Sequence, residues 1–152
     1  AGLRAAAVGA KVSGSAATIP GAAMKPSDIT VQRVYEGTGP EGNYRVLVDR
    51  MWPRGLRRAD LGLDQWDRDI APSSALRQWF GHVEERWAEF RKRYQAELAA
   101  PEQQARIAAL LDAAGERPLT LLYGARDTEH NQAVVLRDVL QDYLRHHRKR
   151  QA

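Results

Sequence analysis

The stretch Arg45-Val-Leu-Val-Asp49, followed by Arg50-Met-Trp-Pro-Arg-Gly55, decides the fold together with a second stretch of the same design. That second stretch is Leu119-Thr-Leu-Leu-Tyr123, followed by Gly124-Ala-Arg-Asp127. Each is a short apolar run that leads into a turn with charged side chains. Runs of this kind are typical of strands buried on both faces of a parallel sheet. The sequence therefore predicts two buried strands that both end in charged turns.

Helical patterns connect the two strands and follow them. The predicted helices span residues 74–80, 84–98 and 101–114, a short one spans residues 63–70, and the last begins after a cap at Asp127. Residues 29–35 alternate between polar and apolar side chains and predict a further strand. Strands that alternate with helices predict an α/β fold. We expect a single small domain with a short, mostly parallel sheet flanked by helices in a Rossmann-like three-layer arrangement.

The 152 residues suffice for one compact domain. We expect a disordered leader at residues 1–27, the α/β domain at residues 28–144 and a basic tail at residues 145–152. The formal net charge of the chain is +4, but the two ends alone hold seven basic side chains and no acid. The predicted domain is therefore slightly acidic, and this weakens the case for a basic nucleic-acid-binding protein.

Both charged turns lie at one edge of the sheet if the two buried strands are parallel, and ligands of open α/β sheets bind at that edge. We expect acid or base roles in catalysis for His130, Asp49 and Asp127. We expect ligand-binding roles for Arg50, Trp52, Arg54, Ser73, Arg77, Arg126 and Asn131. The arginines can bind a carboxylate or phosphate through paired hydrogen bonds, which makes an anionic small molecule the expected ligand.

Structural roles are the alternative for several of these residues. Asp127 can cap the last helix, and Ser73 can cap the helix that follows it. Asp49 can pair with a nearby arginine while Trp52 covers the edge of the sheet. These alternatives stay open at the level of sequence.

Motifs for common cofactors do not occur in the chain. No glycine-rich dinucleotide fingerprint follows a strand, and there is neither a Gly-Lys-Ser/Thr phosphate loop nor a His-Glu-x-x-His pair. The absence of cysteine excludes thiolate metal sites and cysteine nucleophiles. We therefore expect no cofactor and no metal. No run of about 18 apolar residues occurs, so we expect a cytoplasmic protein that does not span a membrane.

The stretch Arg45–Gly55 resembles the YeaO-like proteins, a bacterial family of unknown function (domain-of-unknown-function family 488). The similarity covers residues 29–144 and includes Trp66, Ala71-Pro-Ser73, Arg86-Trp-Ala-Glu-Phe90, Leu121–Asp127 and His130-Asn131. The resemblance implies a small cytoplasmic α/β protein and carries over no activity. Longer relatives look as if they have Cys-His-Arg where this chain has Glu129-His-Asn131, so the resemblance places His130 at a shared position without a thiol beside it.

Three functional hypotheses follow from the sequence. The first is a soluble protein that binds a phosphorylated or nucleotide-like anion at the carboxyl edge of the sheet, with hydrolase or transferase chemistry left open. The second is a nucleic-acid-binding module, favoured by the arginine content, the basic ends and Trp52. The third is a structural protein that binds a partner through the Arg-Trp-Pro turn. The sequence decides neither the reaction nor the oligomeric state.

Overall fold

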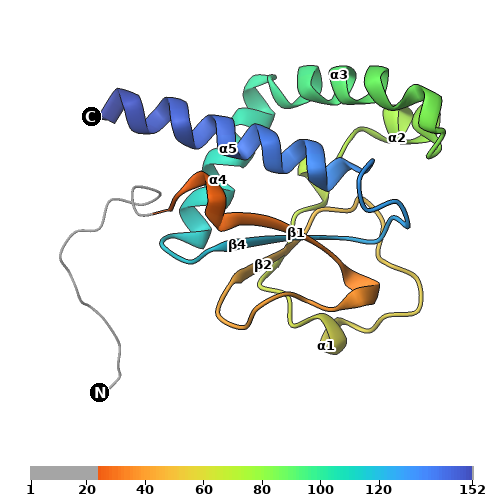
Figure 1. The fold of residues 1–152 in the computed structure, drawn as a ribbon, viewed down its shortest axis with the longest axis horizontal. Helices are drawn as coiled ribbons and strands as arrows, with labels where there is room; N and C mark the ends of the chain where they lie inside the picture. Colours follow the sequence, from red (N-terminus) through yellow and green to blue (C-terminus); the bar gives the residue numbers. More distant parts are fainter. Residues whose placement is uncertain (1–23, 152) are drawn as a thin grey trace.

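The computed structural model describes residues 24–151, with only the backbone for residues 148–151 (Figure 1). Four parallel strands form one sheet in the order β1-β4-β2-β3. Their bounds are Ile29–Arg33 for β1, Tyr44–Leu47 for β2, Gln65–Trp66 for β3 and Leu119–Tyr123 for β4. Every residue of β4 is buried, since β4 has a neighbouring strand on each side and is covered on both faces. The apolar run that predicted a doubly buried strand is thereby confirmed.

Helices cover the two faces of the sheet unequally (Figure 1). One face carries the four longer helices, which are α2 (Ser74–Phe80), α3 (Trp87–Leu98), α4 (Pro101–Ala114) and α5 (Gln132–Gln151). The other face carries α1 (Arg58–Leu61) and the loop around it. Short 3-10 turns span Pro26–Asp28, Val34–Glu36, Arg68–Ile70 and Glu84–Arg86. The predicted α/β class and its single domain are confirmed.

Each face of the sheet has its own apolar core. On the face of the longer helices, Val46 and Leu121 of the sheet belong to the same core as Phe90, Tyr94 and Leu98 of α3. The opposite face has a smaller core of Val34, Leu47, Leu61 and Leu122, against which Trp52 and Trp66 pack. Successive residues of one strand therefore pack into different cores, because successive side chains of a strand point to opposite faces of the sheet.

Three local predictions are wrong. Residues 63–70 do not form a helix, because Gln65 and Trp66 pair with β2 as an edge strand and the Asp67 N–H donates to the Leu47 carbonyl at 2.9 Å. The last helix begins at Gln132, five residues beyond the predicted cap. Residues 24–27 of the predicted leader belong to the domain, since Met24 is fully buried. The rest of that leader lies outside the described residues.

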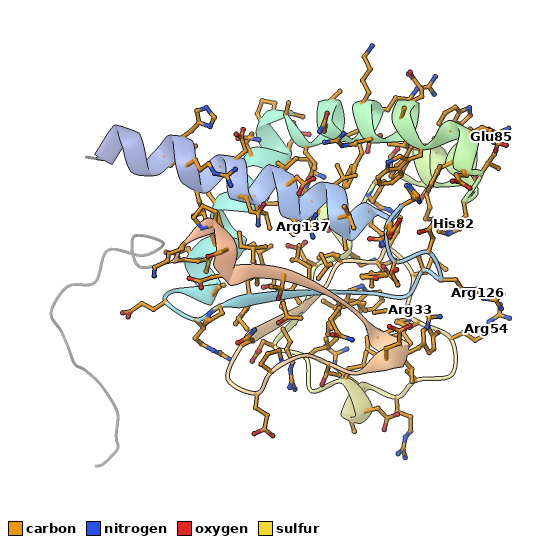
Figure 2. All side chains as sticks on the ribbon, in the orientation of Figure 1. Arg33, Arg54, His82, Glu85, Arg126 and Arg137 are labelled. Carbon is orange, nitrogen blue, oxygen red and sulfur yellow. The ribbon has the colours of Figure 1, made fainter. Side chains whose placement is uncertain are left out.

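The parallel strands all end at the side of the molecule where Figure 2 labels Arg33, Arg54 and Arg126. Arg33 donates from Nε to the Ala125 carbonyl at 2.8 Å, and Tyr35 donates to the Arg54 carbonyl at 2.7 Å. Segments from three parts of the chain are therefore tied together at the carboxyl ends of the strands.

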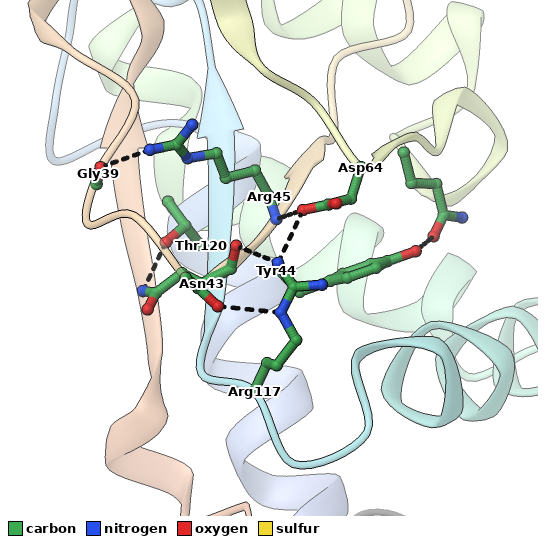
Figure 3. Close-up of polar contacts among 9 residues, drawn as sticks. Gly39, Asn43, Tyr44, Arg45, Asp64, Arg117 and Thr120 are labelled. Atoms are coloured by element: carbon green, nitrogen blue, oxygen red, sulfur yellow. Dashed lines mark hydrogen bonds and ion pairs between the residues drawn. The ribbon is translucent and has the colours of Figure 1, made fainter. Parts of the chain in front are cut away.

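The amino ends of the strands are closed by a polar network (Figure 3). Arg117 donates to the carbonyls of Gly42 and Asn43 at 2.9 Å each, and to the Asp64 carboxylate at 3.3 Å. The Asn43 side chain donates to the hydroxyl of the buried Thr120 at 3.0 Å. These hydrogen bonds give Arg117, Asn43 and Asp64 partners within the protein.

Candidate functional site

Strands β2 and β4 are neighbours whose chains leave the sheet toward opposite faces. After β2 the chain passes to the face of α1, and after β4 it turns to α5 on the face of the longer helices (Figure 1). The two strands stay paired up to this point, where the Val48 N–H donates to the Leu122 carbonyl at 3.0 Å. Such a divergence leaves a crevice outside the carboxyl ends of the strands, the usual ligand site of open α/β sheets.

A pocket of about 130 Å³ lies at this divergence. Its wall is formed by Asp49, Arg50, Met51, Pro72, Arg77, Phe80, His82, Phe90, Ala125 and Gln132. A single water needs roughly 10–15 Å³ of such space, so the pocket has room for a small molecule. The wall combines a carboxylate and two guanidinium groups with an apolar surface, in which Phe80 and Phe90 stack with their ring centroids 4.3 Å apart.

Asp49 connects three segments of the chain at the pocket. Its Oδ2 accepts a hydrogen bond from the Gly124 N–H at 2.9 Å, and its Oδ1 accepts one from the side-chain amide of Gln132, the first residue of α5. A Cβ on Gly124 would lie 3.0 Å from Oδ2, so any other residue at this position would push the carboxylate away by a few tenths of an ångström. No Lys, Arg or His nitrogen within the described residues comes within 4.0 Å of the carboxylate.

Burial raises the pKa of Asp49 from 3.8 to about 6. The hydrogen bonds from Gly124 and Gln132 and the charge of Arg77 act in the opposite direction without cancelling the desolvation. Among the described residues, Asp49 does not form the direct ion pair with an arginine that the sequence left open. Asp49 is a half-buried acid whose carboxylate accepts hydrogen bonds from two neutral donors, the Gly124 N–H and the Gln132 amide.

The two arginines of the pocket wall differ in how they are held. Arg50 donates from Nε to the Pro72 carbonyl at 2.9 Å and from Nη2 to the Ala71 carbonyl at 3.4 Å. These bonds use two of its five N–H donors and fix the plane of the guanidinium. Arg77 lies on α2 with an exposed side chain at the pocket. The predicted ligand-binding residues Arg50 and Arg77 thus reach one pocket together with Asp49.

His82 reaches the pocket through an unusual backbone turn. Gly81 ends α2 in the left-handed region with φ of 49°, and His82 follows with φ of 59°. A residue other than glycine pays a conformational cost there, and such residues often occur at functional sites. The sequence did not predict that His82, Phe80, Phe90 and Gln132 line the site, because their approach depends on how the helices pack.

The predicted acid–base pair of Asp127 and His130 lies outside the pocket wall. Asp127 Oδ1 accepts from the N–H groups of Glu129 at 2.9 Å and His130 at 3.0 Å, and its Oδ2 lies 2.9 Å from Nδ1 of His130. These hydrogen bonds, with that from the Glu129 N–H the strongest, lower the pKa of Asp127. The bond to Asp127 in turn raises the pKa of His130, whose ring meets the edge of Trp87. Both residues stabilise the turn before α5.

Asn131 takes the capping role that was expected of Asp127. Its side chain is buried, Oδ1 accepts from the Val134 N–H at 3.1 Å, and Nδ2 donates to the Asp127 carbonyl at 2.9 Å. An acceptor that binds an N–H three residues later is the usual helix N-cap. Asn131 therefore positions α5 and is not placed in the pocket wall.

The remaining predicted site residues also lie outside the pocket wall. Trp52 donates to the Leu56 carbonyl at 2.7 Å and packs edge-on against Trp66 on the opposite face. Ser73 caps α2 and donates to the Glu97 carboxylate at 2.6 Å, which confirms its structural alternative. Arg54 and Arg126 are exposed at the carboxyl end of the sheet (Figure 2). The predicted cluster of Arg50, Arg54 and Arg126 is thus divided between the pocket and the surface beyond it.

A comparison with protein families finds a model described as "Inactive DUF488-N3 subclade" that matches residues 28–152. The chain belongs to this DUF488 family. "Uncharacterized protein YeaO" of Escherichia coli K12 is 47% identical over 113 residues, which are 74% of this chain and 96% of that protein. "Uncharacterized protein Rv3073c" of Mycobacterium tuberculosis H37Rv is 38% identical over 117 residues, which are 77% of this chain and 97% of that protein.

The resemblance of this DUF488 chain to the YeaO-like proteins is confirmed by these matches. No solved structure matches the chain. Within the part of the chain that the structure describes, no helix has the length and apolarity needed to cross a membrane. Among the same residues, no three or more His, Cys, Asp or Glu side chains gather closely enough to hold a metal ion.

Proposed function

We propose that this DUF488 protein binds a small organic anion, without transforming it, in the pocket beyond the carboxyl ends of β2 and β4. Arg50 carries the proposal. Its guanidinium is held in the pocket wall by two backbone carbonyls and has further N–H donors for a carboxylate or phosphate. Arg77 supplies a second positive charge, and the apolar wall of Phe80 and Phe90 suits the organic part of the ligand.

Binding without catalysis is favoured over hydrolase or transferase chemistry. The residues expected to act as acids and bases are divided, since Asp49 lies in the pocket wall while His130 and Asp127 hold each other outside it. Glu129 stands where similar longer proteins look as if they have a cysteine. The word "inactive" in the description of the family supports the same conclusion.

A polyanion at the rim of the pocket is the second candidate, because Arg54 and Arg126 expose their side chains there. This candidate keeps the part of the nucleic-acid hypothesis that rests on exposed arginines. One of its supports has weakened, since the Trp52 ring packs against Trp66 instead of standing free to stack on a base. Binding of this kind would weaken steeply with added salt, whereas a ligand in the pocket would be less sensitive.

Thermal unfolding in the presence of small carboxylates and phosphates tests the proposal. A ligand at 100 times its dissociation constant stabilises by about 2.7 kcal/mol, which is a shift of about 5–10 °C for a domain of this size. Arg77→Gln should abolish the shift, because it removes a charge from the pocket wall. Arg126→Gln is the matched control, since it removes an exposed arginine outside the wall.

The outcomes separate the two candidates. A shift that survives Arg126→Gln and disappears in Arg77→Gln supports the pocket. A shift that both substitutions weaken equally, and that added salt removes, supports the polyanion at the rim. If no carboxylate or phosphate stabilises the wild-type protein at millimolar concentration, the proposed function is wrong.

A further inference from the structure

The pocket that carries two arginines also carries a half-buried carboxylate, that of Asp49, which has no ion partner among the described residues. Asp49 accepts hydrogen bonds only from Gly124 and Gln132 among the described residues, and both donors are neutral. Each carboxylate oxygen can accept more than one hydrogen bond, so both retain capacity toward a ligand. Buried charges in proteins are usually paired or bound to a ligand, because their desolvation is costly. A ligand with a positively charged group can therefore supply the ion partner that Asp49 lacks among the described residues.

A purely anionic ligand fits this arrangement poorly. It would gain from Arg50 and Arg77 but would also bring a second negative charge next to Asp49, whose carboxylate is already partly desolvated. Like charges in a buried site disfavour each other strongly, and one of them then takes up a proton. A ligand that carries a positive group beside its anionic group meets both sets of residues without this cost.

We infer that the ligand is a small zwitterion of the amino-acid type, whose ammonium group pairs with Asp49 and whose carboxylate binds Arg50 and Arg77. This inference rests on the proposed function and narrows its ligand class. The stacked rings of Phe80 and Phe90 leave an apolar surface for the third substituent. The pocket volume of about 130 Å³ restricts that substituent to a small or medium-sized side chain.

Zwitterions and simple anions should respond to pH in opposite ways. The pKa of Asp49 is about 6, so its carboxylate is ionised at pH 7.5 and mostly neutral at pH 5. A zwitterion needs the ionised form and binds more weakly at pH 5. A simple anion is repelled by the ionised form and binds more tightly at pH 5. The other charged or titratable groups on the pocket wall are Arg50, Arg77 and His82.

Calorimetric titration with matched compounds tests the inference. The probes are the L-amino acids alanine, valine, leucine, methionine and phenylalanine, each compared with the carboxylic acid that lacks the amino group and the amine that lacks the carboxyl group. At pH 7.5 we expect at least one amino acid to bind ten or more times tighter than its deaminated acid. The ratio should fall at pH 5.

Asp49→Asn provides the matched variant. It keeps the shape of the side chain, and a flip of the Gln132 amide restores the hydrogen bond between them. We expect the preference for the amino acid over its deaminated acid to disappear in this variant at both pH values. His82 is present in both proteins, so the difference between them reports on Asp49. Circular dichroism verifies that the variant is folded, and the comparison of ligands on the wild type does not depend on it.

Each outcome decides between the inference and the proposed function. If deaminated acids bind as tightly as the amino acids at pH 7.5, the ligand is not a zwitterion, while the proposed anion site stands. If only the amines bind, the proposed function fails together with the inference. If none of these compounds binds at millimolar concentration, the inference is also wrong. A zwitterion preference that survives Asp49→Asn overturns the assigned role of Asp49.

Discussion

Asp49 shows at the scale of one residue how folding changes chemistry. In the unfolded chain its carboxylate is hydrated, whereas in the fold it lies against the backbone of Gly124 and the side chain of Gln132. The sequence placed Asp49 correctly at the end of a buried strand. It could not show that the neighbouring Arg50 stays out of ion-pair distance, because the Arg50 guanidinium bonds to carbonyls about twenty residues further along the chain.

The first prediction concerns the stability that Asp49 contributes as a function of pH. Its folded pKa of about 6 lies above the unfolded value of 3.8, so the folded state holds an extra proton between these pH values. The contribution of Asp49 is thus most favourable at low pH and is lost as the pH rises through 6. Between pH 4.5 and 7.5 this loss amounts to about 2 kcal/mol.

Urea unfolding of the wild type and of Asp49→Asn at several pH values measures this loss. Over the same range, the variant should gain about 2 kcal/mol relative to the wild type. Other groups with shifted pKa values, such as Asp67 and His130, are present in both proteins and cancel in the difference. A difference that does not change with pH would show that Asp49 titrates normally.

At the scale of elements, helix starts depend on which polar side chain reaches the free N–H groups. Ser73, Asp127 and Asn131 are all good caps by residue type. The structure uses Ser73 for α2 and Asn131 for α5, while Asp127 stabilises the preceding turn. Residue type correctly predicted that Asp127 accepts hydrogen bonds from backbone N–H groups. These N–H groups belong to the turn before α5 and not to the helix itself, because several residues separate Asp127 from the start of the helix.

The second prediction compares the two candidate caps of α5. Asn131→Ala removes the acceptor for the Val134 N–H and the donor to the Asp127 carbonyl in a buried position, and should cost about 1–2 kcal/mol or more. Asp127→Ala acts on an exposed turn and should cost less. Denaturant unfolding of both variants checks the order. A larger loss of stability for Asp127→Ala than for Asn131→Ala would mean that Asp127, the residue that the sequence favoured, is the N-cap of α5.

The amino-terminal boundary is a property of the whole molecule. Met24 is fully buried in the larger core, and the Gln141 side chain of α5 donates to the Pro26 carbonyl at 3.0 Å. The boundary predicted from the sequence lies four residues later, at residue 28, since residues 24–27 have no periodicity of their own. Their order comes from contacts with a helix that lies more than a hundred residues away in the chain.

The third prediction uses the two methionines of the chain as a matched pair. Met24→Ala leaves a cavity in the core and should cost about 2–5 kcal/mol. Met51→Ala should change the stability by less than about 0.5 kcal/mol, because 59% of Met51 is exposed. Thermal or urea unfolding of the two variants measures the difference. Equal effects would mean that Met24 does not belong to the folded domain.

The sequence by itself determined the α/β class, the buried central strand, the helices at residues 74–80 and 101–114, and the edge of the sheet at which the pocket lies. These features follow from local periodicity and from the rule that parallel strands end on one side. Only the tertiary structure decided which charged groups face that pocket. Asp49, Arg50 and Arg77 do so and Arg54, Arg126 and His130 do not, because the path of each loop and its hydrogen bonds to distant segments set the direction of every side chain.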